Sequence, residues 1–316
     1  MNKTMAIAGD NPSRSDARSG ATCSGRLPEF MIIGAMKAGT TTLYEYLLRH
    51  REIFMCPNKE PMFFSREPVY ARGLEWYRSL FSGASDDQRC GEASTCYSRW
   101  PHYDDVPARI AQVVPDVKLI YLMRHPVERA YSHYGHLVFE GVNQSFEQAL
   151  ESEPQITDTS LYMRQINRFL THFDRQQLLL LTFDDLKGDT VGVLEQVQRF
   201  LEVRPADLLA DGPIMANPAG GVPARRRISD VLRSLRGMPG ILHLADAVGS
   251  TGRSSVYRRL LNLISGSFIA RHLARRHRSR ISPLLPETRR RLLETFAPAT
   301  RELERFMERR LDEWFI

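Results

Sequence analysis

One short segment near the start of the printed sequence strongly limits what the chain can fold into. Residues 31–44 read M-I-I-G-A-M-K-A-G-T-T-T-L-Y, an apolar run followed by a turn with two glycines and a lysine, then by three threonines. This order is typical of a buried strand, an anion-binding loop and a helix N-terminus. Free backbone N–H groups and the helix dipole favour a phosphate or a sulfate there.

The position of the lysine distinguishes this loop from that of ATP-binding proteins. The P-loop that binds a nucleoside triphosphate reads G-x-x-x-x-G-K-[ST], with the lysine after the second glycine. Here Lys37 precedes Gly39. The loop is therefore suited to a phosphate but is not typical of a triphosphate site.

Apolar runs that alternate with helical patterns predict the fold class. Buried parallel strands are expected at residues 29–34, 117–123 and 178–183, and helices at residues 40–50, 191–201 and 287–311. The first helix is expected to turn Leu43, Tyr44, Leu47 and Leu48 inward. The pattern predicts a P-loop-like, three-layer α/β fold with a central parallel sheet flanked by helices. Ligands of such sheets bind at the carboxyl ends of the strands, where Arg124 also lies.

Composition and charge divide the chain into a tail, a domain and a basic region. Residues 1–28 are rich in Ser, Gly, Asn and Arg and predict a disordered tail, which leaves residues 29–316 as a single domain. Residues 224–291 hold 16 arginines and three acidic residues, a net charge of +13 against +6 for the whole chain. We expect residues 212–285 to form a basic helical cover over the site, with helices at about residues 228–235 and 256–276. The basic segment suits polyanions or an anionic membrane surface, or else is a solvated helical face.

Cysteine usage and hydropathy indicate the compartment. Cys23, Cys56, Cys90 and Cys96 form no C-x-x-C pair and have no zinc-like spacing, which favours a reducing environment. The first 28 residues lack the apolar core of a signal peptide, and no apolar run is long enough to span a membrane. We expect a cytoplasmic protein that uses no metal ion.

Four sequence blocks, in this order, resemble one enzyme family. They are residues 34–42, residues 58–64 with W-Y-R-S-L at 76–80, residues 124–134 and residues 178–201. The chain resembles sulfotransferases that use 3′-phosphoadenosine 5′-phosphosulfate (PAPS), in the branch similar to heparan sulfate N- and 3-O-sulfotransferases. The resemblance implies transfer of a sulfuryl group from PAPS to a hydroxyl, or to an amine, of a carbohydrate, a glycolipid or a glycosylated metabolite.

By this resemblance, the first block holds the 5′-phosphate of PAPS through backbone N–H groups and threonine hydroxyls. Lys37 is placed near the oxygen that bridges phosphate and sulfate. Negative charge grows on that oxygen as the sulfuryl group leaves, so a fixed cation there lowers the barrier. Otherwise Lys37 is an exposed residue in a glycine turn. The residues implied in cofactor binding are Lys37, Ala38, Gly39, Thr40, Thr41 and Thr42.

The second block resembles the K-E-x-x-F-F segment of glycan O-sulfotransferases. Glu60 matches the glutamate that removes the acceptor proton in that family. A sugar hydroxyl needs such a base because it is a poor nucleophile until its proton is leaving. Lys59 is implied to bind the sulfuryl oxygens or an acidic acceptor. The alternative for Glu60 is a surface carboxylate that precedes a proline.

The third block, R-H-P-V-E-R-A-Y-S at residues 124–132, is similar to the family pattern R-x-P-x-x-R-x-x-S. The resemblance implies that Arg124 and Ser132 bind the 3′-phosphate, which a guanidinium can hold through two parallel hydrogen bonds. Otherwise Arg124 stabilises a strand–helix corner. Arg129 is a candidate for a structural ion pair.

Three further segments match the family less well. The segment E-A-S-T-C-Y at 92–97 aligns with E-K-T-P-S-Y of heparan sulfate 3-O-sulfotransferases, so Ala93 replaces a lysine that could meet a polyanion. The segment L-Y-M at 161–163 implies that Tyr162 lies near the cofactor, although a core aromatic fits equally. The candidates for the basic loop that closes over the nucleotide are Arg225, Arg226 and Arg227.

Two other classes of function stay open. A P-loop kinase or NTPase would need a strand-borne aspartate for magnesium, for which Asp184-Asp185 is the candidate. A non-catalytic module that binds polyanions would use the basic segment. That segment contains Tyr257 and Phe268 as its only Tyr and Phe, which disfavours single-stranded nucleic acid. No motif identifies the acceptor or the oligomeric state.

Overall fold

The computed structural model describes residues 25–214 and 281–316. Within them, parallel strands form one sheet in the order β2-β3-β1-β4-β5. The strands are β1 (Phe30–Gly34), β2 (Ile53–Met55), β3 (Arg89–Ala93), β4 (Lys118–Met123) and β5 (Leu178–Thr182). The strand that leads into the glycine loop therefore lies at the centre of the sheet.

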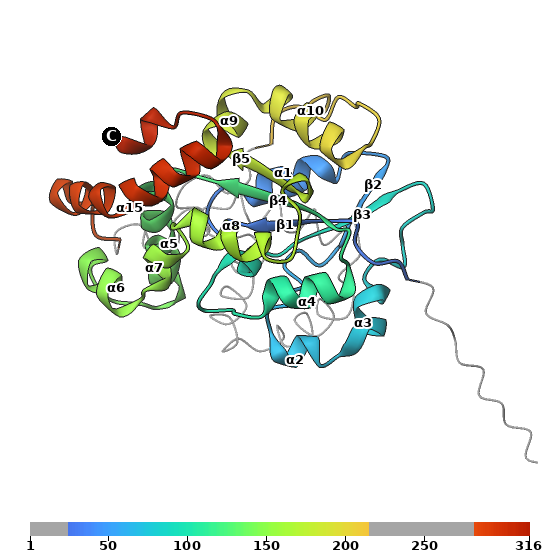
Figure 1. The fold of residues 1–316 in the computed structure, drawn as a ribbon, viewed down its shortest axis with the longest axis horizontal. Helices are drawn as coiled ribbons and strands as arrows, with labels where there is room; N and C mark the ends of the chain where they lie inside the picture. Colours follow the sequence, from blue (N-terminus) through green and yellow to red (C-terminus); the bar gives the residue numbers. More distant parts are fainter. Residues whose placement is uncertain (1–24, 215–280) are drawn as a thin grey trace, which may run out of the picture.

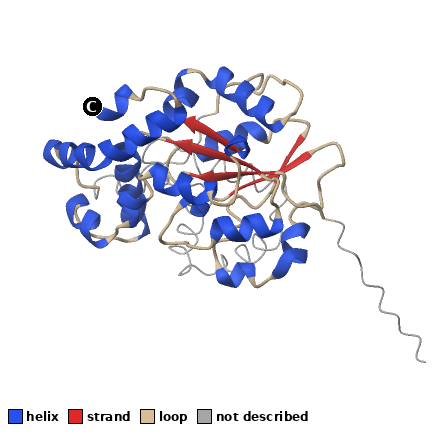
Figure 2. Cartoon of the chain, in the orientation of Figure 1, coloured by secondary structure: helices blue, strands red, loops and turns tan. Residues whose placement is uncertain are grey.

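Helices cover both faces of this sheet (Figure 2). In Figure 1, α9 and α10 lie above the strands, and α2, α3 and α4 lie below them. This three-layer arrangement confirms the predicted P-loop-like α/β fold. The helices are α1 (Thr40–Leu47), α2 (Glu67–Tyr70), α3 (Gly73–Ser79), α4 (Val106–Val113), α5 (Pro126–Glu140), α6 (Phe146–Ser152), α7 (Gln155–Asp158), α8 (Tyr162–Leu170), α9 (Phe183–Gly188), α10 (Thr190–Leu201) and α15 (Pro286–Met307), with 3-10 turns η1 (Thr95–Ser98), η2 (Arg175–Gln177) and η3 (Asp312–Phe315).

The predicted strands are β1, β4 and β5, each correct to within one residue at either end. The sequence predicts neither β2, which has only three residues, nor β3. The sequence of β3 is R-C-G-E-A, and its Glu92 is wholly buried despite its charge. Gly91 is required there because a Cβ would lie 2.1 Å from the Phe30 ring of β1. Hydrophobic runs thus reveal the strands filled by apolar residues but not a strand that buries a carboxylate.

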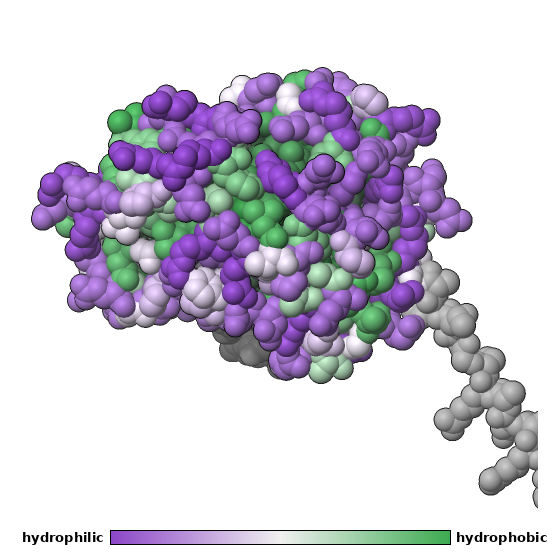
Figure 3. Space-filling view, viewed as in Figure 1, coloured by the Kyte–Doolittle hydropathy of each residue, from purple (hydrophilic) through white to green (hydrophobic). Residues whose placement is uncertain are grey.

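Apolar side chains form two buried clusters, one around the sheet and one between α5, α6 and α15. The first helix differs from its prediction in two respects, because it ends at Leu47 instead of residue 50, and because Leu48 is 46% exposed while Tyr46 is buried instead. The face seen in Figure 3 is mostly hydrophilic, with hydrophobic residues scattered between charged ones. Among the described residues, no helix is both long enough and apolar enough to cross a bilayer.

The last residues of the predicted tail and both ends of the predicted cover contact the rest of the structure. Residues 25–28 fall in the predicted tail, yet Arg26 donates a hydrogen bond of 2.7 Å to the Gln88 carbonyl and Leu27 packs on the core. At one end of the predicted cover, the Ile214 N–H donates to Tyr46 Oη at 2.9 Å. At the other end, Ser282 Oγ and the Tyr134 hydroxyl lie 3.0 Å apart. The expected helices at 228–235 and 256–276 lie outside the described residues.

The final helix is shorter than predicted. It ends at Met307 because Glu308 adopts a left-handed conformation, with φ 52°. The chain then turns, and Leu311 and Trp314 are buried against the main cluster. The segment after α15 therefore packs on the sheet rather than extending the helix.

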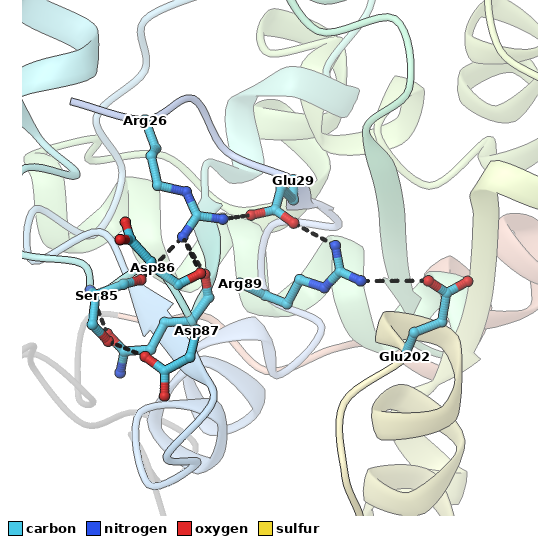
Figure 4. A network of polar contacts seen from close by, with 8 residues as sticks. Arg26, Glu29, Ser85, Asp86, Asp87, Arg89 and Glu202 are labelled. Atoms are coloured by element: carbon cyan, nitrogen blue, oxygen red, sulfur yellow. Dashed lines mark hydrogen bonds and ion pairs between the residues drawn. The ribbon is translucent and has the colours of Figure 1, made fainter. Parts of the chain in front are cut away.

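At the amino ends of the strands, charged side chains form a network (Figure 4). Glu29 pairs with Arg26 and with Arg89, the latter at 2.5 Å. Glu202 pairs with Arg89 at 3.5 Å and with Lys118 at 2.8 Å. The network ties the starts of β1, β3 and β4 to the end of α10.

Candidate active site

The carboxyl ends of the strands meet at one edge of the sheet and carry most of the predicted site residues. In Figure 2 the arrowheads point toward the edge that α5 and α15 flank in Figure 1. Lys37 follows β1, Glu60 follows β2, Thr95 follows β3, Arg124 follows β4 and Phe183 follows β5. The parallel topology therefore brings together residues that are distant in the sequence.

The loop after β1 leaves a set of backbone N–H groups free at the N-terminus of α1. The Ala38 N–H donates to the Ala35 carbonyl at 3.1 Å, and the Thr42 N–H donates to the Gly39 carbonyl at 2.9 Å. In the described part of the chain, the N–H groups of Gly39, Thr40 and Thr41 have no backbone partner. Among the residues expected to bind the 5′-phosphate, Gly39, Thr40 and Thr41 therefore have backbone N–H groups available to an anion.

Gly39 is held in this loop by both its conformation and its neighbour. Its φ of 96° lies in the left-handed region, and a Cβ would lie 2.6 Å from the Phe183 ring. The same ring lies 5.4 Å from the Arg124 guanidinium. Phe183 thus packs against the loop after β1 and against the corner after β4.

Lys37 is surrounded by positive charge. It too has a positive φ, 71°, which is uncommon for a residue other than glycine. Burial lowers the pKa of its ammonium group, and the nearby charges of Arg124, Arg129 and Lys59 lower it further. A bound anion would offset this repulsion, so the environment of Lys37 favours an anionic ligand.

Glu60 is fixed by hydrogen bonds from the segment that follows β3. Thr95 donates to its carboxylate twice, from the backbone N–H at 2.8 Å and from Oγ1 at 3.0 Å. Lys59 Nζ lies 3.6 Å from the same carboxylate and donates to Thr41 Oγ1 at 3.0 Å. Lys59 therefore links Glu60 to the N-terminus of α1. Both side chains are only about a quarter exposed, at 24% for Lys59 and 23% for Glu60.

Arg124 turns toward the loop after β1. Its Nη1 lies 3.5 Å from the Lys37 carbonyl, and its Nη2 lies 3.7 Å from the Glu128 carboxylate. Tyr162 is buried beneath it, with its hydroxyl donating to the Arg124 carbonyl at 2.5 Å. The geometry places Tyr162 as a buried support for Arg124. Ser132 lies further along α5 and is partly exposed.

Arg129 does not form the carboxylate ion pair that the sequence suggests. Within the described residues it is wholly buried and donates to Ser160 Oγ at 2.6 Å, to the Ile156 carbonyl and to the Met36 carbonyl at 3.4 Å. Burial lowers its pKa to about 10, so it stays charged at neutral pH. Its neighbour His133 is neutral, because burial and the arginine charge lower the pKa of the imidazole to about 2.

The two aspartates after β5 are engaged in packing contacts. Asp184 accepts a hydrogen bond of 2.9 Å from the Trp314 indole, and Asp185 pairs with both Nη atoms of Arg309, one of them at 2.7 Å. The hydrogen bonds from Arg309 lower the pKa of the Asp185 carboxyl. Neither residue is therefore free to hold magnesium in the manner of a kinase. No cluster of three or more His, Cys, Asp or Glu residues is found among residues 25–214 and 281–316.

The structure also adds a residue that sequence reasoning did not select. Thr95 contacts the Glu60 carboxylate, although its segment stood out in the sequence only for the lysine missing at Ala93. The signal was the adjacent pair of hydroxyl residues, Ser94 and Thr95, after an unrecognised strand. The arginines proposed for the nucleotide loop, Arg225, Arg226 and Arg227, lie outside the described residues.

Comparison with known protein families now decides the class. A model of the sulfotransferase domain matches residues 27–211, which is more than half of the chain. The chain belongs to the sulfotransferase domain family. It is therefore a transferase, and enzymes of this family take their sulfuryl group from PAPS.

Curated relatives point to one branch of this family. The sulfotransferase is similar to human heparan sulfate glucosamine 3-O-sulfotransferase 3B1, with 30% identity over 69% of this chain and 56% of that protein. It is also similar to human bifunctional heparan sulfate N-deacetylase/N-sulfotransferase 3, with 31% identity over 58% of this chain and 23% of that protein. The chain thus spans little more than half the length of the former and about a quarter of the latter.

A solved structure matches over a larger share of the chain. The sulfotransferase from Alicyclobacillus acidocaldarius superposes with a TM-score of 0.62 and 25% identity, covering 92% of this chain and 99% of that one. The architecture around the sheet is therefore that of a known sulfotransferase fold.

Proposed function

We propose that this chain transfers the sulfuryl group of PAPS to a hydroxyl of a carbohydrate, a glycolipid or a glycosylated metabolite. One observation carries the proposal. Lys59 joins a loop with free N–H groups and a partly buried, positively surrounded Lys37 to a fixed carboxylate, Glu60. An anion site beside a held base suits the donor and acceptor sides of an in-line transfer.

Each residue receives one role in this mechanism. When bound, PAPS supplies the sulfuryl group and leaves as adenosine 3′,5′-bisphosphate. Lys37 stabilises the negative charge on the bridging oxygen as its bond to sulfur breaks. Glu60 accepts the proton of the acceptor hydroxyl as the new sulfur–oxygen bond forms. Lys59 offsets the negative charge of the sulfuryl oxygens while the sulfuryl group moves from the donor to the acceptor.

The second phosphate of the donor is assigned to the corner after β4. Arg124 and Ser132 bind the 3′-phosphate in this proposal, and Tyr162 holds Arg124 from below through its hydroxyl. Phe183 packs on the same corner and leaves the Arg124 side chain partly exposed, at 22%. The closing contacts on the nucleotide are proposed for Arg225, Arg226 and Arg227.

A carbohydrate acceptor is supported by the two groups of relatives, whose names describe heparan sulfate sulfation. Ala93 is buried and supplies no cation where the related segment has a lysine. A less highly charged acceptor than heparan sulfate therefore fits this chain better. Because one of the two groups sulfates nitrogen, an amine acceptor is the alternative outcome of the assay.

Two experiments test the proposal. In the first, we expect adenosine 3′,5′-bisphosphate to raise the melting temperature without magnesium. Stabilisation by Mg-ATP and not by adenosine 3′,5′-bisphosphate would contradict the proposal and favour a kinase. In the second, labelled PAPS is offered with a panel of glycans, glycolipids and small phenols, and the products are read by mass spectrometry. We expect label on a glycan or glycolipid hydroxyl.

Location and surface binding form a separate proposal. We propose a cytoplasmic enzyme, supported by the free, buried thiols of Cys56, Cys90 and Cys96, which suit a reducing compartment. We also propose that the basic segment at 224–291 contacts an anionic membrane surface. Cell fractionation tests the first point. Sedimentation with vesicles that contain phosphatidylserine, at low and high salt, tests the second.

A further inference from the structure

A buried carboxylate behind the acceptor side of the site has no role in the chemistry described above. Glu92 lies in β3 and is 0% exposed. Three hydroxyl groups donate to it: Tyr77 at 2.6 Å and Tyr97 at 2.9 Å to Oε1, and Ser94 at 3.0 Å to Oε2. A buried carboxylate with this many charge-assisted hydrogen bonds fixes its neighbours strongly.

Two of those hydroxyls also hold the segment that carries Glu60. Ser94 Oγ accepts a hydrogen bond of 3.1 Å from the Met62 N–H, and Tyr97 Oη accepts one of 3.4 Å from the Phe64 N–H. Each hydroxyl has one proton, and it uses this proton to donate a hydrogen bond to Glu92. Its lone pairs are left to accept a hydrogen bond from a backbone N–H. Glu92 therefore sets the donor–acceptor direction of both hydrogen bonds to the Glu60 segment, Met62 N–H to Ser94 and Phe64 N–H to Tyr97, which we call the two bridges.

The segment needs such support because its backbone is strained. Glu60 and Met62 have φ values of 62° and 57°, in the left-handed region that residues with a side chain rarely adopt. The Glu60 N–H donates to the Ala93 carbonyl at 2.9 Å, and Thr95 donates to the Glu60 carboxylate. Ala93, the last residue of β3, thus holds the backbone of the segment, and Thr95 holds the Glu60 carboxylate.

We propose that Glu92 is a positioning residue, which fixes the Glu60 carboxylate on the acceptor side by ordering Ser94 and Tyr97 as acceptors for the Met62 and Phe64 N–H groups. This inference rests on the proposed function for its catalytic consequence. Its structural consequence, a rigid segment at 60–64, stands independently of any acceptor.

Protonation of Glu92 would weaken this arrangement near neutral pH. Burial raises its pKa to about 7, against the opposing effect of the hydrogen bonds from Tyr77, Tyr97 and Ser94, and the charge of Glu60 adds to the rise. A neutral carboxyl group donates through one oxygen, so it accepts fewer hydrogen bonds. The titratable or polar groups that face Glu92 are Tyr77 of α3, Ser94, Cys96 and Tyr97 of the segment after β3, Glu60, and Cys56 after β2.

The test compares three variants with a matched control. Glu92→Gln keeps the size of the side chain and removes the charge, while Ser94→Ala and Tyr97→Phe each remove one bridge. Tyr77→Phe is the control. It removes a hydroxyl from Glu92 Oε1, the oxygen that Tyr97 also contacts, but it removes no bridge to the Glu60 segment.

We expect kcat to fall about 10²-fold in Glu92→Gln and about tenfold in each bridge variant, because a small misplacement of a catalytic group is costly. The Kd of adenosine 3′,5′-bisphosphate should change by no more than about twofold in these variants. The kcat of Tyr77→Phe, measured well above pH 7 where Glu92 is ionised, should also change by no more than about twofold, because both bridges to the Glu60 segment stay in place. Wild-type kcat should also fall as the pH drops through about 7, and Glu92→Gln should lack this limb.

Hydrogen–deuterium exchange gives a readout that needs no acceptor. Amides of residues 60–64 should exchange faster in Glu92→Gln and Ser94→Ala than in wild type, and at the wild-type rate in Tyr77→Phe. Unchanged exchange in folded Glu92→Gln and Ser94→Ala would overturn the inference. So would a loss of kcat in Tyr77→Phe equal to that in Ser94→Ala. If wild type transfers no sulfuryl group to any acceptor, the proposed function fails, and the exchange data still decide the role of Glu92.

Discussion

The two edges of the sheet hold charge in opposite ways. At the amino edge, Arg26 and Arg89 share Glu29, and Arg89 and Lys118 share Glu202 (Figure 4). At the carboxyl edge, Lys37 and Arg129 have no carboxylate partner among the described residues. The pairs that Lys59 and Arg124 form there are long, at 3.6 Å between Lys59 and Glu60 and 3.7 Å between Arg124 and Glu128.

This difference separates a structural edge from a binding edge. Paired charges near solvent satisfy one another and contribute modestly to stability. Unpaired cations that are partly or wholly buried are costly to the folded protein, and the lowered pKa of Lys37 expresses that cost. An anionic ligand that binds only the folded state recovers it. The excess charge at the carboxyl edge is therefore best understood as part of a binding site.

The largest expected effect tests whether charge at the carboxyl edge serves chemistry. Lys37→Ala should lower kcat by about 10³-fold, because it removes the cation at the developing negative charge. Lys118→Ala, at the amino edge, is the control and should leave kcat unchanged. Turnover of labelled PAPS at saturating acceptor measures both. An equal loss of kcat in the two variants would show that charge at the carboxyl edge has no special role in the reaction.

The second prediction concerns the Glu60 carboxylate on the acceptor side. Glu60→Gln should lower kcat by about 10²-fold, because the variant cannot accept a proton. The affinity for adenosine 3′,5′-bisphosphate should be nearly intact, which calorimetry can verify. Near-normal turnover in this variant would mean that another base acts.

The third prediction separates binding from turnover. Arg124→Ala should weaken adenosine 3′,5′-bisphosphate binding by about tenfold, the value of a charged hydrogen bond to phosphate. Arg89→Ala removes the same type of side chain from the amino edge and should bind the nucleotide as wild type does. A wild-type Kd in Arg124→Ala would refute its assignment to the 3′-phosphate.

The smallest effect is expected at the amino edge itself. Arg89→Ala should lower the free energy of unfolding by about 1 kcal/mol or less, because its ion pairs with Glu29 and Glu202 are partly exposed. Urea denaturation measures this loss, and 1 M NaCl should reduce it. A loss of several kcal/mol would show that the amino edge is more than a set of solvated pairs.

The donor side of the site could be predicted from sequence because its signals are local. The loop after β1 and the corner at Arg124 each follow an apolar strand and carry a compact motif. The acceptor side was harder to predict, since Glu60 is held by Thr95, 35 residues away, across a strand with little apolar content. Arg129 shows the same limit, because its carbonyl partners depend on tertiary packing that no pattern along α5 encodes.

The indole of Trp314 has a consequence for how the enzyme matures. Its hydrogen bond to Asp184 joins residues 130 positions apart, and its ring packs on Tyr162, which supports Arg124. During synthesis, the sheet and the loop after β1 can assemble long before this indole emerges from the ribosome. The corner that is proposed to hold the 3′-phosphate then lacks one of its supports. The nascent chain thus acquires its donor loop early and its fully supported second phosphate site late.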